Sequence, residues 1–171
     1  MKSKMSTPTP SEIVLAVDPG FDRIGLAIMK SEKNEIKLLF SECFTTSPKE
    51  TRQERLYAIG KRISEVIKKW KPKTLAIETL FFNTNTTSAI GVAEARGIII
   101  YEGARARMKV FEYGPQTVKV AVTGYGKADK TQVGEMVKRL VKLPKQSGKR
   151  LDDEVDAIAL GITHLATKKG I

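Results

Sequence analysis

The sequence predicts a mixed α/β domain built on one five-stranded sheet. Three apolar segments with strand character come first and are separated only by short turns. Helical and extended segments then alternate, and the chain closes with helices. This order favours three antiparallel strands, followed by two strands that right-handed crossovers place parallel to the first. With 171 residues, 41% of them hydrophobic, the chain has a usual length for one domain with a full core.

The first three strands are expected to form an antiparallel meander. Ile13–Val17 is a continuous apolar run, which is typical of a central strand covered on both faces. Arg23–Met29 follows closely enough to form a hairpin with it, and Glu35–Phe44 comes after a turn at Asn34. Residues 1–12 precede this pattern, so we expect a disordered tail there and a domain over residues 13–168.

A helix and a fourth strand are predicted next. Thr51–Trp70 has apolar residues at helical spacing, and Lys71-Pro72 ends it. The residues expected on its buried face are Leu56, Ile59, Ile63, Val66 and Ile67. Thr74–Ile77 then forms a short apolar strand, with Glu78 at its carboxyl end.

A second long helix is expected to begin with Thr87 or Ser88 as its cap and to run to about Arg107. Small residues give it a low-profile strip that another backbone could approach closely. Such a helix is either a central core helix or a dimer contact. The small residues are Gly91, Ala95 and Gly97.

The remaining elements are one strand and three helices. Lys109–Glu112 is the fifth strand, and Pro115 begins a short helix over Gln116–Val122. Thr131–Lys142 and Leu151–Lys168 are amphipathic helices. The first is expected to turn Val133, Met136, Val137, Leu140 and Val141 inward, and the second Val155, Ile158, Ala159, Ile162 and Leu165.

Acidic residues stand at the ends of two strands that should be neighbours. Asp18 ends the first strand and Glu78 the fourth, so parallel pairing would bring them together at one edge of the sheet. Ligand sites of open α/β sheets lie at this edge. Asp18 alone could equally serve to start the turn at Pro19-Gly20.

The last helix brings further carboxylates. Asp153 and Asp156 share a face, as do Asp152 and Asp156. The helix dipole accounts for Asp152 and Glu154 near the amino end but poorly for Asp156, which interrupts an apolar run. A charge in that place needs a partner or a metal ion.

Four carboxylates from three separated segments therefore could converge on a metal site: Asp18, Glu78, Asp153 and Asp156. Oxygen ligands select hard ions, so Mg²⁺ or Mn²⁺ is expected rather than zinc. Two such ions about 3.5–4 Å apart would clamp the attacking and leaving oxygens of a phosphodiester. The net charge of +11 favours a polyanionic partner such as nucleic acid, although a lysine-rich surface can also serve solubility.

The remaining composition points to a reducing compartment, and we expect the cytoplasm. No apolar run is long enough to span a membrane, and the amino-terminal residues lack the apolar region of a secretory signal. Cys43 is the single cysteine and is expected to be a strand residue. His164 is the single histidine, and a zinc site there is not expected.

Six motifs resemble the RuvC family of Holliday-junction resolvases, within the RNase H-like superfamily. They occur in the order VDPG (17–20), AIETLFF (76–82), SAIGVAEARG (88–97), VFEYGPQTVK (110–119), ADKTQV (128–133) and DDEVDAIALGITH (152–164). The resemblance covers almost the whole chain. It implies a homodimeric, Mg²⁺-dependent endonuclease of DNA recombination and repair, which nicks two opposed strands of a four-way junction symmetrically.

The resemblance also implies roles for single residues. Asp18, Glu78, Asp153 and Asp156 match the family's metal-binding acids. Phe81 matches an aromatic residue that stacks at the junction centre, and Lys119 and Lys130 match basic residues beside the active site. The helix from Ser88 to Arg107 matches the element next to the dimer interface. Cellular relatives work alongside a branch-migration motor, which is a further expected partner.

The chain departs from the family's pattern in places, and two other readings remain open. Some relatives have His in place of Asp153, and the segment KQSGKR (145–150) is unusually basic. The chain could be another RNase H-like nuclease, such as an rRNA-processing nuclease of the YqgF type, although Phe81 and ADKTQV argue against this. It could also be a non-catalytic junction-binding protein, which would not need the acid at Asp156.

Overall fold

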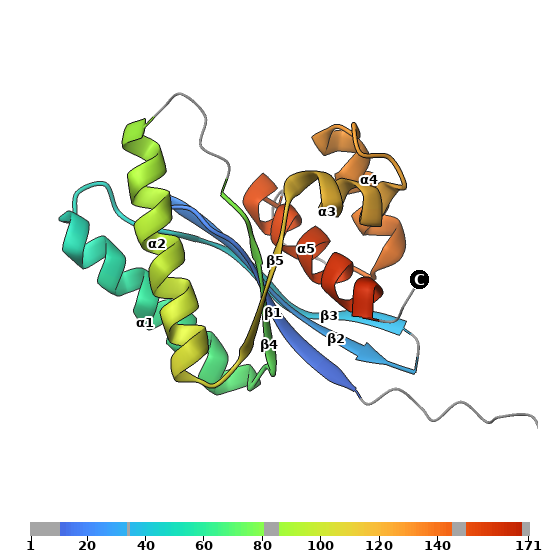
Figure 1. Ribbon diagram of the computed structural model, residues 1–171, viewed down its shortest axis with the longest axis horizontal. Coiled ribbons are helices and arrows are strands. Elements are labelled where there is room, and N and C mark those ends of the chain that lie inside the picture. The colour runs from blue at the N-terminus through green and yellow to red at the C-terminus, as the bar shows by residue number, and fades with distance from the viewer. Residues whose placement is uncertain (1–10, 34, 81–85, 145–149, 169–171) are drawn as a thin grey trace, which may run out of the picture.

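The computed structural model describes residues 11–33, 35–80, 86–144 and 150–168, and it contains the predicted five-stranded sheet (Figure 1). The strand order is β3-β2-β1-β4-β5. The β1–β2 and β2–β3 pairs are antiparallel, whereas β1–β4 and β4–β5 are parallel. The strands are β1 (Glu12–Asp18), β2 (Arg23–Glu32), β3 (Glu35–Thr45), β4 (Thr74–Glu78) and β5 (Lys109–Tyr113).

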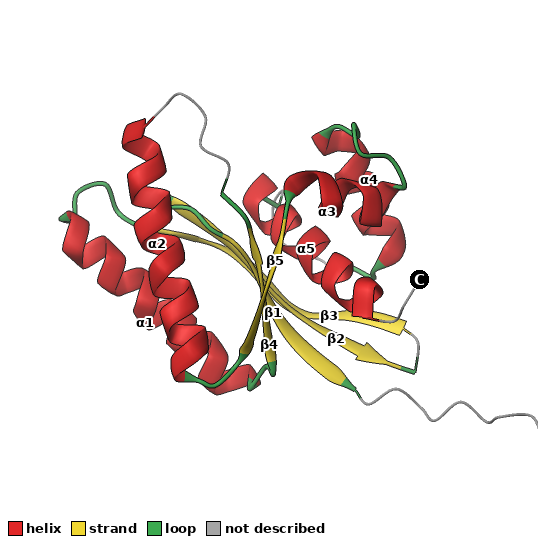
Figure 2. Ribbon diagram, in the orientation of Figure 1, coloured by secondary structure: helices red, strands yellow, loops and turns green. Residues whose placement is uncertain are grey.

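Helices cover both faces of this sheet (Figure 2). A pair of helices packs into one hydrophobic core and the other described helices into the second, one core on each face of the sheet. Figure 1 shows the two groups on opposite sides. The first pair is α1 (Arg52–Trp70) and α2 (Thr86–Arg105), and the second group is α3 (Pro115–Thr123), α4 (Lys130–Leu140) and α5 (Asp152–Lys168). Within the described ranges, no helix combines the length and the apolar character that a membrane span requires.

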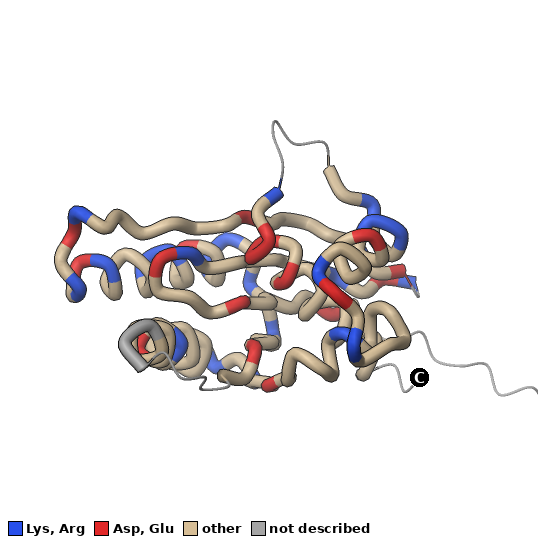
Figure 3. Tube along the Cα trace, turned by 90° about the horizontal axis from the view of Figure 1, so that it is seen from above, with Lys and Arg blue, Asp and Glu red and all other residues tan. Residues whose placement is uncertain are grey.

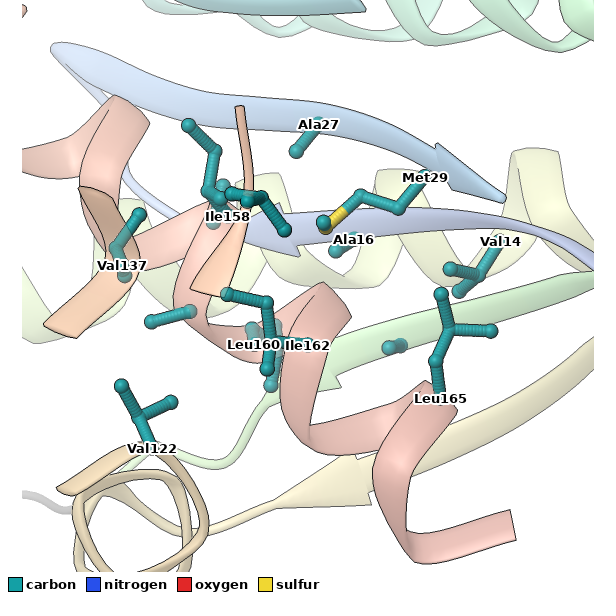
Figure 4. Close-up of a cluster of buried hydrophobic side chains, with 14 of the residues drawn as sticks. Val14, Ala16, Ala27, Met29, Val122, Val137, Ile158, Leu160, Ile162 and Leu165 are labelled. Atoms are coloured by element: carbon teal, nitrogen blue, oxygen red, sulfur yellow. The ribbon is translucent and has the colours of Figure 1, made fainter. Parts of the chain in front are cut away.

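The central strand β1 separates two hydrophobic cores. Val14 and Ala16 point to the α3–α5 side, and Leu15 and Val17 point to the α1–α2 side. All four are fully buried, which confirms the prediction of a strand covered on both faces. Figure 4 shows the first core, where side chains of α5 pack onto β1 and β2. This double cover holds the carboxyl end of β1 in a fixed place.

The first strand begins one residue earlier than predicted. Glu12 belongs to β1 and pairs with Ser31 of β2, so it is not part of a tail. Its carboxylate accepts a hydrogen bond of 2.9 Å from the Thr74 hydroxyl, which ties this end of β1 to β4. Residues 1–10, the rest of the predicted tail, lie outside the described residues.

Helix α1 follows the sequence prediction closely. Thr51 caps it, because the Thr51 hydroxyl accepts from the amide of Glu54 and the Glu54 carboxylate accepts from the amide of Thr51. At the other end Lys71 adopts a left-handed conformation with φ 49°, and Pro72 follows. Ile59, Ile63, Val66 and Ile67 are buried, and Leu56 packs at the margin of the same core.

Helix α2 begins at Thr86 and ends at Arg105, which corrects two expectations. Thr87 and Ser88 lie inside its first turn, so neither occupies the cap position, which precedes the first helical residue. The small residues also fall on two different faces. Ala95 is fully buried, and a Cβ at Gly91 would meet the Phe21 ring at 3.1 Å, whereas nothing lies within 4 Å of one at Gly97.

Helix α4 ends earlier than predicted, which changes the place of one apolar residue. Val141 has extended backbone angles of φ −134° and ψ 141°, so the helix stops at Leu140. Val141 turns into the core at 3% exposure, while Leu140 is 45% exposed. The prediction that Leu140 faces inward was therefore wrong. The helix ends at Leu140, and the extended Val141 fills the core position at this end of α4 instead.

Helix α5 lies unusually close to the sheet at two glycines. A Cβ on Gly25 of β2 would lie 1.8 Å from the carbonyl oxygen of Asp153, and one on Gly161 would lie 2.5 Å from the Met29 sulfur. Gly25 is needed because a side chain there would meet backbone and push α5 off the sheet, whereas the flexible Met29 side chain could move aside at Gly161. This close approach places the first turn of α5 over β2, next to the end of β1.

Candidate active site

Two carboxylates meet at the carboxyl ends of β1 and β4, as the sequence predicted. The parallel register pairs Val17 with Ile77, so Asp18 and Glu78 occupy adjacent positions one residue further on. The two side chains are linked by a hydrogen bond. Arg96 of α2 secures this strand end, because its Nε donates to the Glu78 carbonyl oxygen at 3.2 Å and its guanidinium pairs with Glu112 at 2.5 Å.

Burial and like charges perturb this pair strongly. Burial, followed by the negative charge of Glu78 and that of Asp156, raises the pKa of Asp18 from 3.8 to about 9. Burial also raises the pKa of Glu78. Since Asp18 and Glu78 share a hydrogen bond, one proton lies between two oxygens at neutral pH. The cluster therefore keeps a proton in a place where a cation would be favoured.

Asp156 reaches the same cluster from α5 and is paired with Lys130. The Lys130 Nζ lies 3.3 Å from an Asp156 carboxylate oxygen. Burial raises the pKa of Asp156 in spite of this cation, and the charge of Asp156 raises the pKa of Lys130. The sequence predicted that Asp156 needs a partner, and the structure supplies Lys130.

Asp153 approaches from the same helix but faces β2. Its carboxylate lies 3.1 Å from the Arg23 Nε and 3.9 Å from the Cys43 Sγ. Its negative charge contributes to the raised pKa of Asp18, so it belongs electrostatically to the cluster. Asp152 is exposed and does not act on Asp18 in this way, although it does affect Lys130. Of these two neighbours, Asp153 is therefore the better placed.

A cavity of about 240 Å³ opens beside the acids. Its lining combines two of the acids with both basic residues that the sequence singled out, Lys119 and Lys130. The lining residues are Glu78, Pro115, Val118, Lys119, Lys130, Val133, Asp156 and Leu160. The structure thus brings six of the seven predicted site residues to one end of the sheet. The seventh, Phe81, lies outside the described residues.

Sequence reasoning missed three residues that organise this region: Arg23, Arg96 and Glu154. Glu154 is 2% exposed and accepts hydrogen bonds from the Ser41 hydroxyl at 2.6 Å and from the Arg150 Nε at 3.1 Å. The sequence analysis accounted for Glu154 by the helix dipole alone. Its spacing of four from the buried Ile158 was the available signal that it faces inward.

The donor set suits a hard divalent cation. It consists of carboxylate oxygens that are partly buried and repel one another. Their raised pKa values keep a proton in the cluster at neutral pH. In the part of the chain that the structure describes, no three His, Cys, Asp or Glu side chains are yet grouped closely enough to hold a metal ion. The reason is visible in the pairing: Asp153 is turned to Arg23, and Asp156 to Lys130. For the four acids to share a metal ion, these two side chains would have to turn inward.

A sheet of this order with acids at the ends of β1 and β4 and on the last helix defines the class of RNase H-like nucleases. The comparisons then identify the family. Residues 14–164 match the family model described as crossover junction endodeoxyribonuclease RuvC. The chain belongs to the RuvC family.

Relatives of the same name cover almost the full chain. The RuvC of Alkaliphilus metalliredigens is 41% identical over 152 residues, which are 89% of this chain and 92% of the relative. That of Alkaliphilus oremlandii is 41% identical over 155 residues, or 91% and 93% of the two chains. These matches confirm the resemblance that the six motifs suggested.

Solved structures agree with the fold. The Thermus thermophilus RuvC in complex with a Holliday junction substrate superposes with a TM-score of 0.85 at 31% identity, covering 92% of this chain and 95% of the other. The yeast mitochondrial Holliday junction resolvase Ydc2 gives 0.70 at 14% identity, covering 96% and 82%. At that identity the second match supports the fold alone.

Proposed function

We propose that this chain is a structure-selective endonuclease that resolves four-way DNA junctions by symmetric paired nicks on opposed strands. The observation that carries the proposal is the cluster of Asp18, Glu78, Asp153 and Asp156 at the carboxyl ends of β1 and β4. The chain that holds this cluster matches the RuvC family from residue 14 to 164. The nuclease domain would span residues 13–168. The role belongs to DNA recombination and repair, and the expected compartment is the cytoplasm.

The four acids would hold two Mg²⁺ ions, for which Mn²⁺ would substitute. Such ions lower the pKa of a bound water and stabilise the attacking and leaving oxygens of a phosphodiester. The protein's own part is to keep the acids together: β1 and β4 fix Asp18 and Glu78, and α5 carries Asp153 and Asp156. The proton shared by Asp18 and Glu78 must leave before both oxygens can act as ligands.

Basic residues would hold the DNA strand over these acids. Lys119 and Lys130 line the cavity beside Glu78 and Asp156, where each ammonium can contact a backbone phosphate. Lysine and arginine positions are distributed over strands and helices throughout the molecule (Figure 3), which suits a large anionic partner. Phe81, three residues after Glu78 in the sequence, would stack on an unpaired base at the junction centre.

Two symmetric nicks need two active sites, so we expect a homodimer. One face of α2 is suited to the contact. Ile90 is 56% exposed and Tyr101 is 62% exposed, and Gly97, whose surroundings are open, lies between them at helical spacing. Sedimentation of the active protein should give a dimer, and an active monomer would contradict this part of the proposal. A branch-migration motor is a further expected partner.

The function is tested by cleavage of a mobile four-way junction, with Mg²⁺ or EDTA, beside plain duplex and an RNA–DNA hybrid. We expect paired nicks on the junction only, and only with Mg²⁺. Asp18→Asn should abolish cleavage while it preserves or tightens junction binding, because it removes negative charge near the phosphates. Cleavage of the hybrid would favour another RNase H-like nuclease, and tight binding without cleavage would favour a non-catalytic junction-binding protein.

A further inference from the structure

Arg23 forms an ion pair with Asp153, a carboxylate that the proposed metal ion would need. It is the first residue of β2, and its Nε lies 3.1 Å from the Asp153 Oδ2. The Arg23 side chain is 52% exposed, whereas that of Asp153 is 23% exposed. The guanidinium can therefore swing into solvent without leaving a buried cation unpaired.

The arrangement makes two cations compete for one carboxylate. A guanidinium stays charged at every pH of interest, so Arg23 cannot leave Asp153 by losing a proton. The Asp153 backbone cannot move closer to β2, because its carbonyl oxygen already lies directly over Gly25. Rearrangement of the two side chains is the simplest way to change this pairing. A metal ion that draws the Asp153 carboxylate toward the other acids therefore separates it from Arg23.

We propose that Arg23 is a positioning residue for metal binding at Asp153. It holds the carboxylate before the ion arrives, the ion displaces it, and the freed guanidinium turns to a backbone phosphate of the bound strand. Arg23 thereby lowers the metal affinity of the free protein and favours loading when DNA is present. This inference rests on the proposed metal site and adds a residue that the sequence analysis did not assign.

The first test measures Mn²⁺ binding to the DNA-free protein by electron paramagnetic resonance. Arg23→Gln should tighten Mn²⁺ binding by about two- to fivefold, the range expected when a half-exposed ion pair no longer competes. Arg105→Gln is the matched control: its side chain is 54% exposed and paired with Glu102, at the far end of α2 from Glu78. That control should leave Mn²⁺ binding unchanged.

An Asp153→Asn background separates displacement from general electrostatics. There Arg23 has no carboxylate to hold, so Arg23→Gln should no longer tighten Mn²⁺ binding. An equal gain in both backgrounds would overturn the proposal, because any lost positive charge near the cluster would then suffice. An unchanged Mn²⁺ affinity in Arg23→Gln alone would overturn it as well.

The second test measures junction affinity by fluorescence anisotropy in EDTA and in Ca²⁺, a hard cation that carboxylates also bind. In EDTA, Arg23 is held by Asp153, so Arg23→Gln should weaken binding no more than Arg105→Gln does. In Ca²⁺ the loss should exceed that of the control, because the freed guanidinium contacts phosphate. Equal losses in both conditions would remove the phosphate step from the proposal.

The wild-type protein and Asp18→Asn distinguish this inference from the function on which it rests. If Asp18→Asn binds Mn²⁺ as well as the wild type, the proposed metal site is wrong, and the role of Arg23 is overturned with it. If Asp18→Asn loses Mn²⁺ binding while Arg23→Gln behaves as wild type, the metal site stands and only the role of Arg23 is wrong.

Discussion

The partly buried acids Asp18 and Glu78 share a proton, and losing that proton destabilises the metal-free protein. Burial and the charges of Glu78 and Asp156 raise the pKa of Asp18 from 3.8 to about 9. The folded protein therefore binds more protons than the unfolded chain between about pH 4 and about pH 9. The contribution of Asp18 to stability accordingly falls as the pH rises through this window.

Asp18→Asn should stabilise the protein in EDTA, and more so at alkaline pH. Asparagine resembles the protonated acid and cannot ionise, so it avoids the cost of a buried charge. The melting temperature should rise by about 2–4 °C for each kcal/mol regained, with a larger gain at pH 9 than at pH 5. The exposed Glu50 supplies the control Glu50→Gln. A gain that is equal at both pH values would contradict the assigned pKa.

The elements meet most closely where the first turn of α5 lies on β2. Gly25 has no side chain, and this lets the Asp153 carbonyl oxygen sit directly on the strand. Glu154 fixes the same turn from the side, because it accepts from Ser41 of β3 and from Arg150 just before the helix. The position of Asp153 and Asp156 thus depends on the contact between α5 and the sheet.

Gly25→Ala should disturb both stability and the acid cluster. The new Cβ would lie 1.8 Å from the Asp153 carbonyl oxygen, so α5 must shift away from β2. We expect a loss of about 1–3 kcal/mol or more in the free energy of unfolding, measured with a denaturant, and weaker Mn²⁺ binding.

Gly97→Ala is the matched control for this prediction. Nothing lies within 4 Å of a Cβ there, so the helix should gain up to about 1 kcal/mol from the better helix former. Equal effects of the two substitutions on unfolding would show that close packing at Gly25 is not the cause. The control is read in the unfolding of the monomer, since Gly97 lies on the face proposed for dimerisation.

At the scale of the whole molecule, the net charge of +11 governs encounter with DNA. Junction affinity in EDTA should fall by about 10³-fold or more between 50 and 200 mM salt if six or more phosphates are contacted. Lys119→Ala should lower the slope of log affinity against log salt by about one. Lys61→Ala, an exposed lysine of α1, should leave the slope nearly unchanged. A slope unaffected by Lys119→Ala would show that this side chain contacts no phosphate.

The sequence by itself determined the fold and the identity of the acids. Periodicity separated strands from helices, because period-two burial and helical spacing are local properties of the chain. The parallel pairing of β1 with β4 followed from chain order, and it placed Asp18 beside Glu78. Asp156 was recognised because it interrupts an apolar face. Element ends were less predictable, as Leu140 shows, since the end of a helix depends on what the next residue packs against.

Only the tertiary structure decided which charges neutralise one another. Arg23 and Asp153 are far apart in the sequence, as are Lys130 and Asp156, and no local pattern pairs them. The burial of Glu154 depends likewise on Ser41 of a distant strand. The raised pKa of Asp18 arises from burial together with acids of two other segments, β4 and α5. Electrostatic energy depends on distance in space and on access to water, and packing alone fixes both.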